Sequence, residues 1–205
     1  MILRRLTTDT KGATAAEFGI VLPLFILFLL GIIDVGRWLW TYNHLEKATQ
    51  MGARMAVVTN ASVGTEAAKT GLYASYIGVG GLTQGDNIPP SALGKITCTS
   101  GSCTCTTTPC PALGAFSSAD FTRVANDMKL FYHEVQPTNV TIEYSSSGLG
   151  FAGNPNGPDV APVVTVRLSG MTFTPLACEL VGCSFAMPAF VSSLTYEDGI
   201  GSQSN

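Results

Sequence analysis

An uninterrupted apolar run near the N-terminus is the feature that most limits how this chain can fold. Residues 18–33 (FGIVLPLFILFLLGII) carry no charge, and as a helix they would be about 24 Å long. Extending that helix to Trp38 gives about 31 Å, which is enough to cross a hydrocarbon core of about 30 Å. Trp40 and Tyr42 would then lie near the far interface, where amphipathic rings are favoured. We therefore expect one membrane-spanning helix, with the lipid bilayer as a partner.

The composition and charge of the chain agree with a membrane anchor. Of 205 residues, 12% are charged and the mean hydropathy is +0.30, whereas soluble domains carry about a quarter charged residues. The net charge of −3 gives no electrostatic support for a nucleic-acid partner. Arg4, Arg5 and Lys11 outweigh Asp9 before the apolar run, so the positive-inside rule predicts a cytoplasmic N-terminus and an extracytoplasmic remainder.

The helix is expected to continue beyond the membrane. A cleaved secretory signal is the competing interpretation, but the run is long for one and no small-x-small site follows it promptly. Instead, apolar or small residues recur at three- and four-residue spacing and form one face: Val35, Trp38, Leu39, Tyr42, Leu45, Thr49, Gly52 and Ala56. This pattern predicts a single helix of about 45 residues, half in lipid and half outside.

Glu17 stands at the edge of the apolar run, where a carboxylate is costly unless it is paired. It could simply lie among headgroups beside Lys11. The residues KGATAAEF, however, resemble the prepilin-peptidase motif of the tight-adherence (Flp) branch of type IV pili, Gly-x-x-x-x-Glu followed by Phe or Tyr. The resemblance implies cleavage after Gly12, with Ala13 as the new N-terminus, Glu17 as the fifth residue and Phe18 after it.

The wider N-terminal segment resembles the TadE-like minor pseudopilins over about residues 11–58. The matching features are Pro23, an acidic residue before Gly-Arg (Asp34 before Gly36 and Arg37), and the later Gly-Ala-Arg at residues 52–54. Ala13 departs from type II secretion and type IVa pilins, which usually place Phe there. Pro23 removes a helix hydrogen bond, and we weigh a kink that helps assembly equally with a tolerated membrane proline.

The resemblance implies a non-enzymatic role in a pilus system. The chain would be a minor pseudopilin, processed by a prepilin peptidase, that helps to assemble or prime a Flp-type adhesion pilus. Its partners would be other minor pseudopilins, Flp pilin and the inner-membrane assembly platform. It would sit in the bacterial inner membrane with a periplasmic C-terminal domain, or enter the pilus. The alternatives are an uncleaved, signal-anchored extracytoplasmic binding or enzymatic domain, and a long pilin subunit of the filament shaft.

Residues 59–205 are expected to form a pilin-like α+β domain, after a leader (1–12) and the anchor helix with its extension (13–58). Periodicity predicts helices over 65–77 and 119–135, with Ser117 and Asp120 as a cap, and a loop over 78–95. Alternation predicts strands over 140–144 and 163–173, while 185–196 fits either strand or short helix. Strands joined by loops favour an antiparallel sheet packed on helices.

Six cysteines follow the predicted membrane helix: Cys98, Cys103, Cys105, Cys110, Cys178 and Cys183. Disulfides are favoured over metal, because the compartment oxidises thiols and the spacing is not a standard zinc pattern. Three pairings are open among the first four, whereas Cys178–Cys183 is the natural local pair, worth about 2 kcal/mol in the chain-entropy model.

Motifs for catalysis are absent from the sequence. His44 and His133 are far in sequence from any acid–nucleophile motif, and no P-loop, G-x-S-x-G, H-E-x-x-H or EF-hand loop occurs. We therefore expect no enzyme activity, no cofactor and no metal.

Overall fold

The computed structural model describes residues 11–59, 70–155, 157–179 and 182–196, with only the backbone for Lys11, Ala13, Thr14 and Glu179. The basic residues used to predict orientation, Arg4 and Arg5, lie outside these ranges, as does the first part of the helix predicted over 65–77. The chain divides into two compact units. Unit 1 comprises residues 1–42 and 172–186, and unit 2 comprises residues 43–171 and 187–205.

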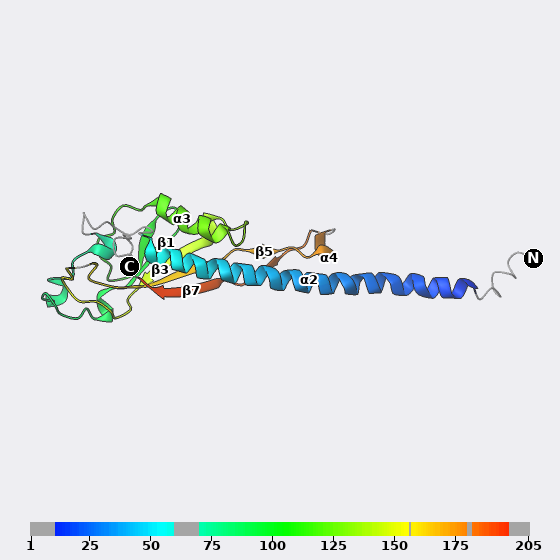
Figure 1. Ribbon diagram of the computed structural model, residues 1–205, viewed down its shortest axis with the longest axis horizontal. Coiled ribbons are helices and arrows are strands. Elements are labelled where there is room, and N and C mark those ends of the chain that lie inside the picture. Colours follow the sequence, from blue (N-terminus) through cyan, green and yellow to red (C-terminus); the bar gives the residue numbers. More distant parts are fainter. Residues whose placement is uncertain (1–10, 60–69, 156, 180–181, 197–205) are drawn as a thin grey trace, which may run out of the picture. The chain divides into compact units, whose positions relative to one another are not determined.

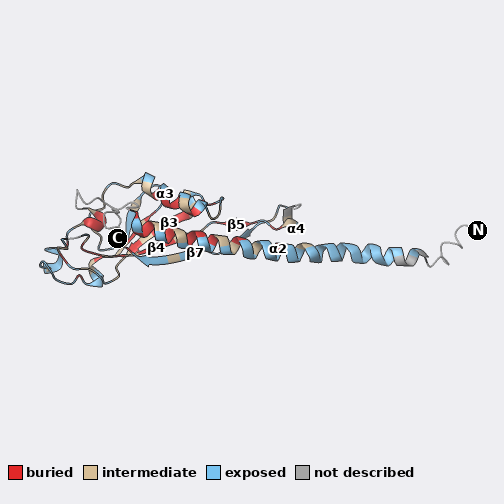
Figure 2. Cartoon of the chain, in the orientation of Figure 1, coloured by how far each residue is buried: buried red, intermediate tan, exposed pale blue. Residues whose placement is uncertain are grey.

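The longest element is the helix α2 (Lys11–Val58), which begins in unit 1 and ends in unit 2 (Figure 1). Its 48 residues correspond to about 72 Å. It is long and apolar enough to cross a membrane, and the side chains of its apolar run, such as Phe18, Leu24 and Phe28, are exposed. Figure 2 shows the N-terminal part of α2 in the colour of exposed residues. Such a continuous exposed apolar surface needs lipid or a partner. The predicted long helix is confirmed, and it is compatible with a single-pass anchor.

Unit 1 adds a small disulfide-closed segment to the first part of α2. The strands β5 (Thr172–Phe173) and β6 (Phe185–Ala186) pair antiparallel, with Phe173 opposite Phe185. Between them lie a short helix, α4 (Leu176–Glu179), and the Cys178–Cys183 disulfide. We call residues Thr172–Ala186 the hairpin.

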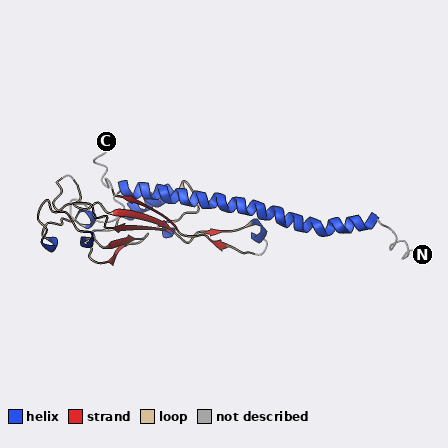
Figure 3. Ribbon diagram, turned by 90° about the horizontal axis from the view of Figure 1, so that it is seen from below, coloured by secondary structure: helices blue, strands red, loops and turns tan. Residues whose placement is uncertain are grey.

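Unit 2 is built on an antiparallel sheet with strand order β2-β1-β3-β4-β7, seen edge-on in Figure 3. Its strands are β1 (Lys95–Cys98), β2 (Cys103–Thr107), β3 (Val140–Ser145), β4 (Val163–Leu168) and β7 (Phe190–Thr195). Together with α2 and α3 (Ser118–Lys129), this sheet confirms the predicted α+β class.

The two faces of the sheet differ as the alternation in β3 and β4 predicts. One face buries apolar side chains, among them Ile96, Ile142, Tyr144, Val164 and Val166. The other carries polar groups, including Glu143, which pairs with Lys95 at 3.2 Å and approaches Arg167 at 3.9 Å. An antiparallel sheet with one packed and one polar face needs helices on one side only.

Helices α2 and α3 supply the apolar cover for that core. In α2 the buried residues of unit 2 follow a helical stripe: Leu45, Ala48, Thr49, Gly52, Ala53, Ala56 and Val57. In α3 they are Phe121, Val124, Ala125 and Met128. Gly52 lies against both Met128 and Val166, so α2, α3 and β4 meet at a residue without a side chain.

Helix α3 begins where the cap predicts and ends earlier than expected. The Ser117 hydroxyl accepts a hydrogen bond from the amide of Asp120 at 3.3 Å, which confirms the cap. The helix stops at Lys129 rather than Val135. The chain then turns tightly, and the Val135 amide donates to the Tyr132 carbonyl at 3.1 Å. Val135 fits the apolar spacing of the helix because it is buried, but the turn buries it and not a continuation of α3.

The helix predicted over 65–77 is wrong where it can be compared. Only a 3-10 turn, η1 (Gly71–Tyr73), forms there, and Gly71 has φ +62°. The Tyr76 amide donates to the buried carboxylate of Asp159 at 2.7 Å, which also accepts from Gly153 and Asn154. In a helix the Tyr76 amide would donate to a backbone carbonyl, whereas here it donates to the side chain of Asp159.

Other boundaries follow from glycine and edge-strand chemistry. The strand predicted over 163–173 breaks after Leu168, where Gly170 takes φ +74°, and the ambiguous stretch 185–196 forms β6 and β7. The predicted loop over 78–95 holds two short 3-10 turns, η2 (Val79–Gly81) and η3 (Pro90–Ala92), and an isolated antiparallel bridge from Asn87 to Phe151, before β1 begins at Lys95. A further 3-10 turn, η4 (Pro137–Asn139), precedes β3. Strands β1 and β2 were not predicted, because β2 consists of Cys and Thr and lies exposed at the edge.

Candidate functional site

The predicted processing residues lie in the first turns of α2. Gly12, Glu17 and Phe18 are all exposed, and a Cβ added at Gly12 would meet nothing within 4 Å. Ala13 belongs to the same helix. An enzyme acting on this segment would therefore meet no steric obstacle from the described residues around Gly12.

Pro23 lies inside α2, and the helix is continuous on both sides of it. Because proline has no N–H, the Gly19 carbonyl receives no hydrogen bond from this residue. A role for Pro23 as a flexible point in assembly stays a prediction.

A second constellation gathers around Asp34, directly after the apolar run. The Asp34 carboxylate is buried and accepts hydrogen bonds from the amides of Leu176 at 2.7 Å and Ala177 at 3.1 Å. The Arg37 guanidinium donates to the same carboxylate at 3.2 Å. A residue of α2, the helix that we call the stem, thus binds the first turn of α4 in the hairpin, 142 residues further along the chain.

Arg37 and the hairpin form the rest of this constellation. The Arg37 guanidinium carbon lies 5.5 Å from the centre of the Phe173 ring, within cation–π range. Beside it is a cavity of about 390 Å³. We call this the hairpin cavity, and it is lined by Asp34, Val35, Trp38, Phe173, Pro175 and Phe185.

Sequence reasoning singled out Asp34 and Arg37 only as parts of a motif and missed what they contact. Asp34 follows sixteen uncharged residues, and a carboxylate at the edge of such a run needs a partner, as Glu17 does. That need would have marked Asp34 as a candidate. Its partners include backbone amides, and the pattern of side chains in a sequence does not predict these.

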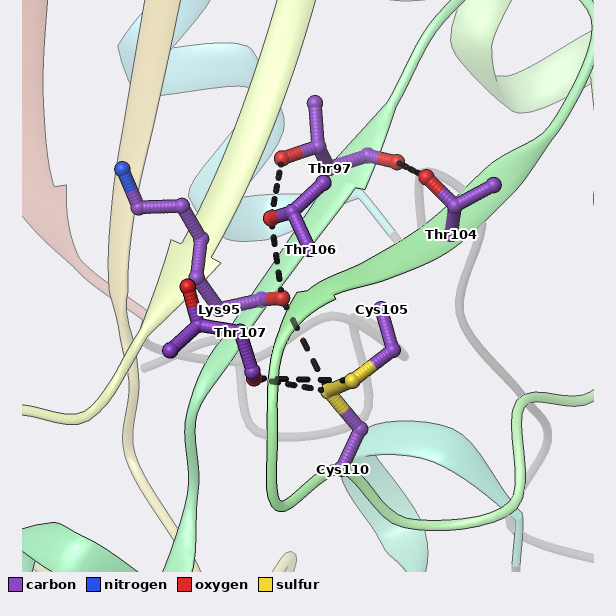
Figure 4. The surroundings of a disulfide bond; sticks show 7 residues. All are labelled: Lys95, Thr97, Thr104, Cys105, Thr106, Thr107 and Cys110. Carbon is purple, nitrogen blue, oxygen red and sulfur yellow. Dashed lines mark hydrogen bonds between the residues drawn. A yellow bond between two sulfur atoms is a disulfide. The ribbon is translucent and has the colours of Figure 1, made fainter.

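The cysteines pair locally, each across a separation of five residues: Cys98–Cys103, Cys105–Cys110 and Cys178–Cys183. The first joins facing residues of β1 and β2, and the second ties the end of β2 to the following loop (Figure 4). Beside it, the Thr106 hydroxyl donates to the Lys95 carbonyl at 3.1 Å. The structure therefore selects one of the three pairings that the sequence left open.

The two histidines do not come together with a nucleophile or a metal set. His44 Nδ1 lies 3.0 Å from the Phe131 carbonyl oxygen, and His133 is exposed, 3.9 Å from Glu134. Among the described residues, no group of three or more His, Cys, Asp or Glu side chains could hold a metal ion.

Two ionisable groups of unit 2 are perturbed by local contacts. The Thr83 amide and hydroxyl donate to Asp86 at 2.7 and 2.8 Å, and these hydrogen bonds hold the pKa of Asp86 below its usual value. Burial, with the nearby Asp159 charge, raises the pKa of Tyr76 to about 12. Both groups shape the irregular segments next to the sheet rather than the Asp34 constellation.

Comparison with protein families finds a match for part of α2. Residues 12–54 match the family model of TadE-like proteins. This segment is similar to TadE-like proteins. The matched range begins at Gly12 and includes Glu17, Asp34, Arg37 and Gly52, so the resemblance seen in the sequence is confirmed there.

The family match covers residues 12–54, which lie within α2. Neither the search of curated proteins nor that of solved structures found a match. The comparisons thus characterise the stem, and unit 2 beyond residue 54 is described by its own geometry alone.

Proposed function

We propose that this protein is a minor pseudopilin that is cleaved after Gly12 by a prepilin peptidase and helps to assemble or prime a Flp-type pilus. The role is structural rather than enzymatic. The observation that carries the proposal is the TadE-like match, which starts at Gly12 and continues through an exposed apolar helix. Partners would be other minor pseudopilins, Flp pilin, the peptidase and the inner-membrane assembly platform.

The stem would serve both storage and assembly. Before assembly, the exposed apolar face of α2 would be covered by lipid, with the N-terminus cytoplasmic and unit 2 periplasmic. After cleavage, the new amine at Ala13 would be close in sequence to the Glu17 carboxylate. In a low dielectric the two charges attract strongly, within one chain or between neighbouring helices, which would favour a defined register between subunits.

Co-expression with a prepilin peptidase tests the processing step. Intact-mass analysis should show loss of residues 1–12 in the wild-type chain. Gly12→Val should block the loss, because a branched side chain would fill the cleavage position. Gly31→Val is the matched control, since its Cβ also meets nothing within 4 Å in the same helix but lies far from Gly12.

An unshifted mass in the presence of active peptidase would refute maturation and favour an uncleaved, signal-anchored domain. Immunogold labelling of assembled pili then tests the minor role. Sparse label at a tip or base supports it, whereas label along the filament would identify a shaft subunit instead.

A further inference from the structure

The hairpin lies level with the end of the apolar run of α2. Asp34 is the first charged residue after residues 18–33, and it precedes Trp38 by four residues, or about 6 Å of helix. A 31 Å span counted from Phe18 ends at Trp38. Leu176 and Ala177 bind the Asp34 carboxylate directly. With the span placed in this way, the tip of the hairpin would lie where hydrocarbon gives way to headgroups.

At the hydrocarbon boundary a carboxylate such as Asp34 needs hydrogen-bond donors. A carboxylate near the hydrocarbon boundary is costly unless its oxygens are satisfied. Two hairpin amides and the Arg37 guanidinium supply three donors to it. The hairpin therefore makes Asp34 tolerable at this level, and Asp34 in turn fixes the hairpin to the helix.

Exposed apolar side chains of the constellation add to the exposed apolar surface of α2. Phe185 is 56% exposed and Val35 is 60% exposed, and both line the hairpin cavity. On the same helix, Trp40 is also exposed. Apart from Asp34, which is occupied by its donors, every residue that lines the cavity is apolar or aromatic.

Of the ion pair beside the cavity, the guanidinium is the more exposed partner. The Arg37 side chain is 45% exposed although it pairs with Asp34, so part of its guanidinium remains open to a further acceptor. An apolar cavity beside a half-exposed guanidinium and interfacial aromatic rings matches the chemistry of a phospholipid, whose acyl carbons and phosphate lie next to each other.

We propose that the hairpin is a phospholipid-binding element seated in the interface of the leaflet on the domain side. The hairpin cavity takes an acyl segment of an adjacent phospholipid, and Arg37 faces its phosphate. The stem then has a second membrane contact besides its span, and this contact sets the depth of the helix. The inference requires a membrane but neither cleavage after Gly12 nor pilus assembly, so it can fail independently of the proposed function.

Fluorescence quenching by brominated lipids tests the depth of the hairpin. The full chain carrying Phe185→Trp, in a background of Trp38→Phe and Trp40→Phe, is reconstituted into phosphatidylcholine–phosphatidylglycerol vesicles with shallow bromine labels on the acyl chains. Leu149→Trp in the same background is the control, because Leu149 is 58% exposed in unit 2. We expect the indole at residue 185 to be quenched at least threefold more strongly than the one at residue 149.

Two further variants distinguish lipid binding from simple proximity. Asp34→Asn removes the charge that holds the hairpin, so quenching at residue 185 should fall toward the control value while the helical circular dichroism of α2 is retained. Arg37→Gln should abolish any preference of quenching at residue 185 for brominated phosphatidylglycerol over brominated phosphatidylcholine.

Equal quenching at residues 185 and 149 would overturn the proposal. So would efficient photocrosslinking from residue 185 to a second copy of the chain in vesicles, which would show that protein rather than lipid covers the cavity.

Discussion

Replacing Gly52 with valine tests the closest approach of the stem helix to the domain core. A Cβ at this position would lie 2.5 Å from Met128 Sδ, 2.7 Å from Met128 Cγ and 3.3 Å from Val166 Cγ1. Ordinary contact begins at 3.4 Å, so Met128 would have to move by about 0.9 Å. Met128 and Val166 are both fully buried, which leaves little room for that movement.

The expected cost follows from overpacking. Extra carbons forced into a packed core cost about 1–3 kcal/mol, and valine adds two methyl groups beyond the clashing Cβ. Its better helix propensity relative to glycine returns only about 0.4 kcal/mol. We therefore expect the free energy of unfolding to fall by about 2 kcal/mol, which raises the fraction of molecules with an opened core about 30-fold.

Amide hydrogen exchange of the full chain in mild detergent measures this loss. Exchange of the β4 amides, Val163–Leu168, should accelerate about 30-fold in Gly52→Val, because these amides open with the core. Gln50→Val is the control at an exposed position of the same helix, where only a small propensity cost is expected.

A compensating variant separates crowding from other effects. Met128→Ala alone should cost about 2–5 kcal/mol, but combined with Gly52→Val it removes the clashing atoms, so the double variant should lose less than the sum of the two. Unchanged β4 exchange in Gly52→Val, or strictly additive losses in the double variant, would refute the packing argument.

Three further predictions concern the hairpin and a turn of unit 2. Asp34→Asn should speed exchange of the first two α4 amides several-fold in detergent while β3 exchange stays unchanged; equal acceleration in both would indicate general destabilisation instead. Replacing Cys178 and Cys183 with serine should loosen the hairpin by about 2 kcal/mol, measured by its amide exchange, without altering the sheet; no change would show that the disulfide constrains nothing. Because the pKa of Asp86 is lowered in the folded chain, the turn to Thr83 is favoured above the ordinary value of 3.8 and is lost as the pH falls through the depressed value. An NMR titration of the Thr83 amide should show this loss, and a midpoint at or above 3.8 would contradict it.

Local spacing was sufficient for the elements whose contacts lie close in sequence. The apolar run and its extension predicted α2, Ser117 and Asp120 predicted the start of α3, and alternation predicted β3. The six-residue motif from Gly12 to Glu17, for which processing stays a prediction, could be recognised without a fold because it lies along a single helix. In each case, neighbours along the chain supply most of the determining interactions.

Tertiary contacts decided the rest. A 3-10 turn forms within the segment 65–77 in place of the expected helix, because the Tyr76 amide donates to Asp159, 83 residues away. Cys98 pairs with Cys103 because they are facing residues of β1 and β2. A sequence of Cys and Thr residues does not predict this strand pairing.

The sequence by itself determined that this protein has a long apolar helix, able to cross a membrane, and an N-terminal segment similar to TadE-like proteins. Charge, hydropathy and motif spacing are local properties. Only the tertiary structure decided that Asp34 is a bond between the stem and the hairpin. Its partners are the amides of Leu176 and Ala177, and every residue has an amide. Which amides reach a buried carboxylate depends on where folding brings the backbone, and no pattern of side chains records that.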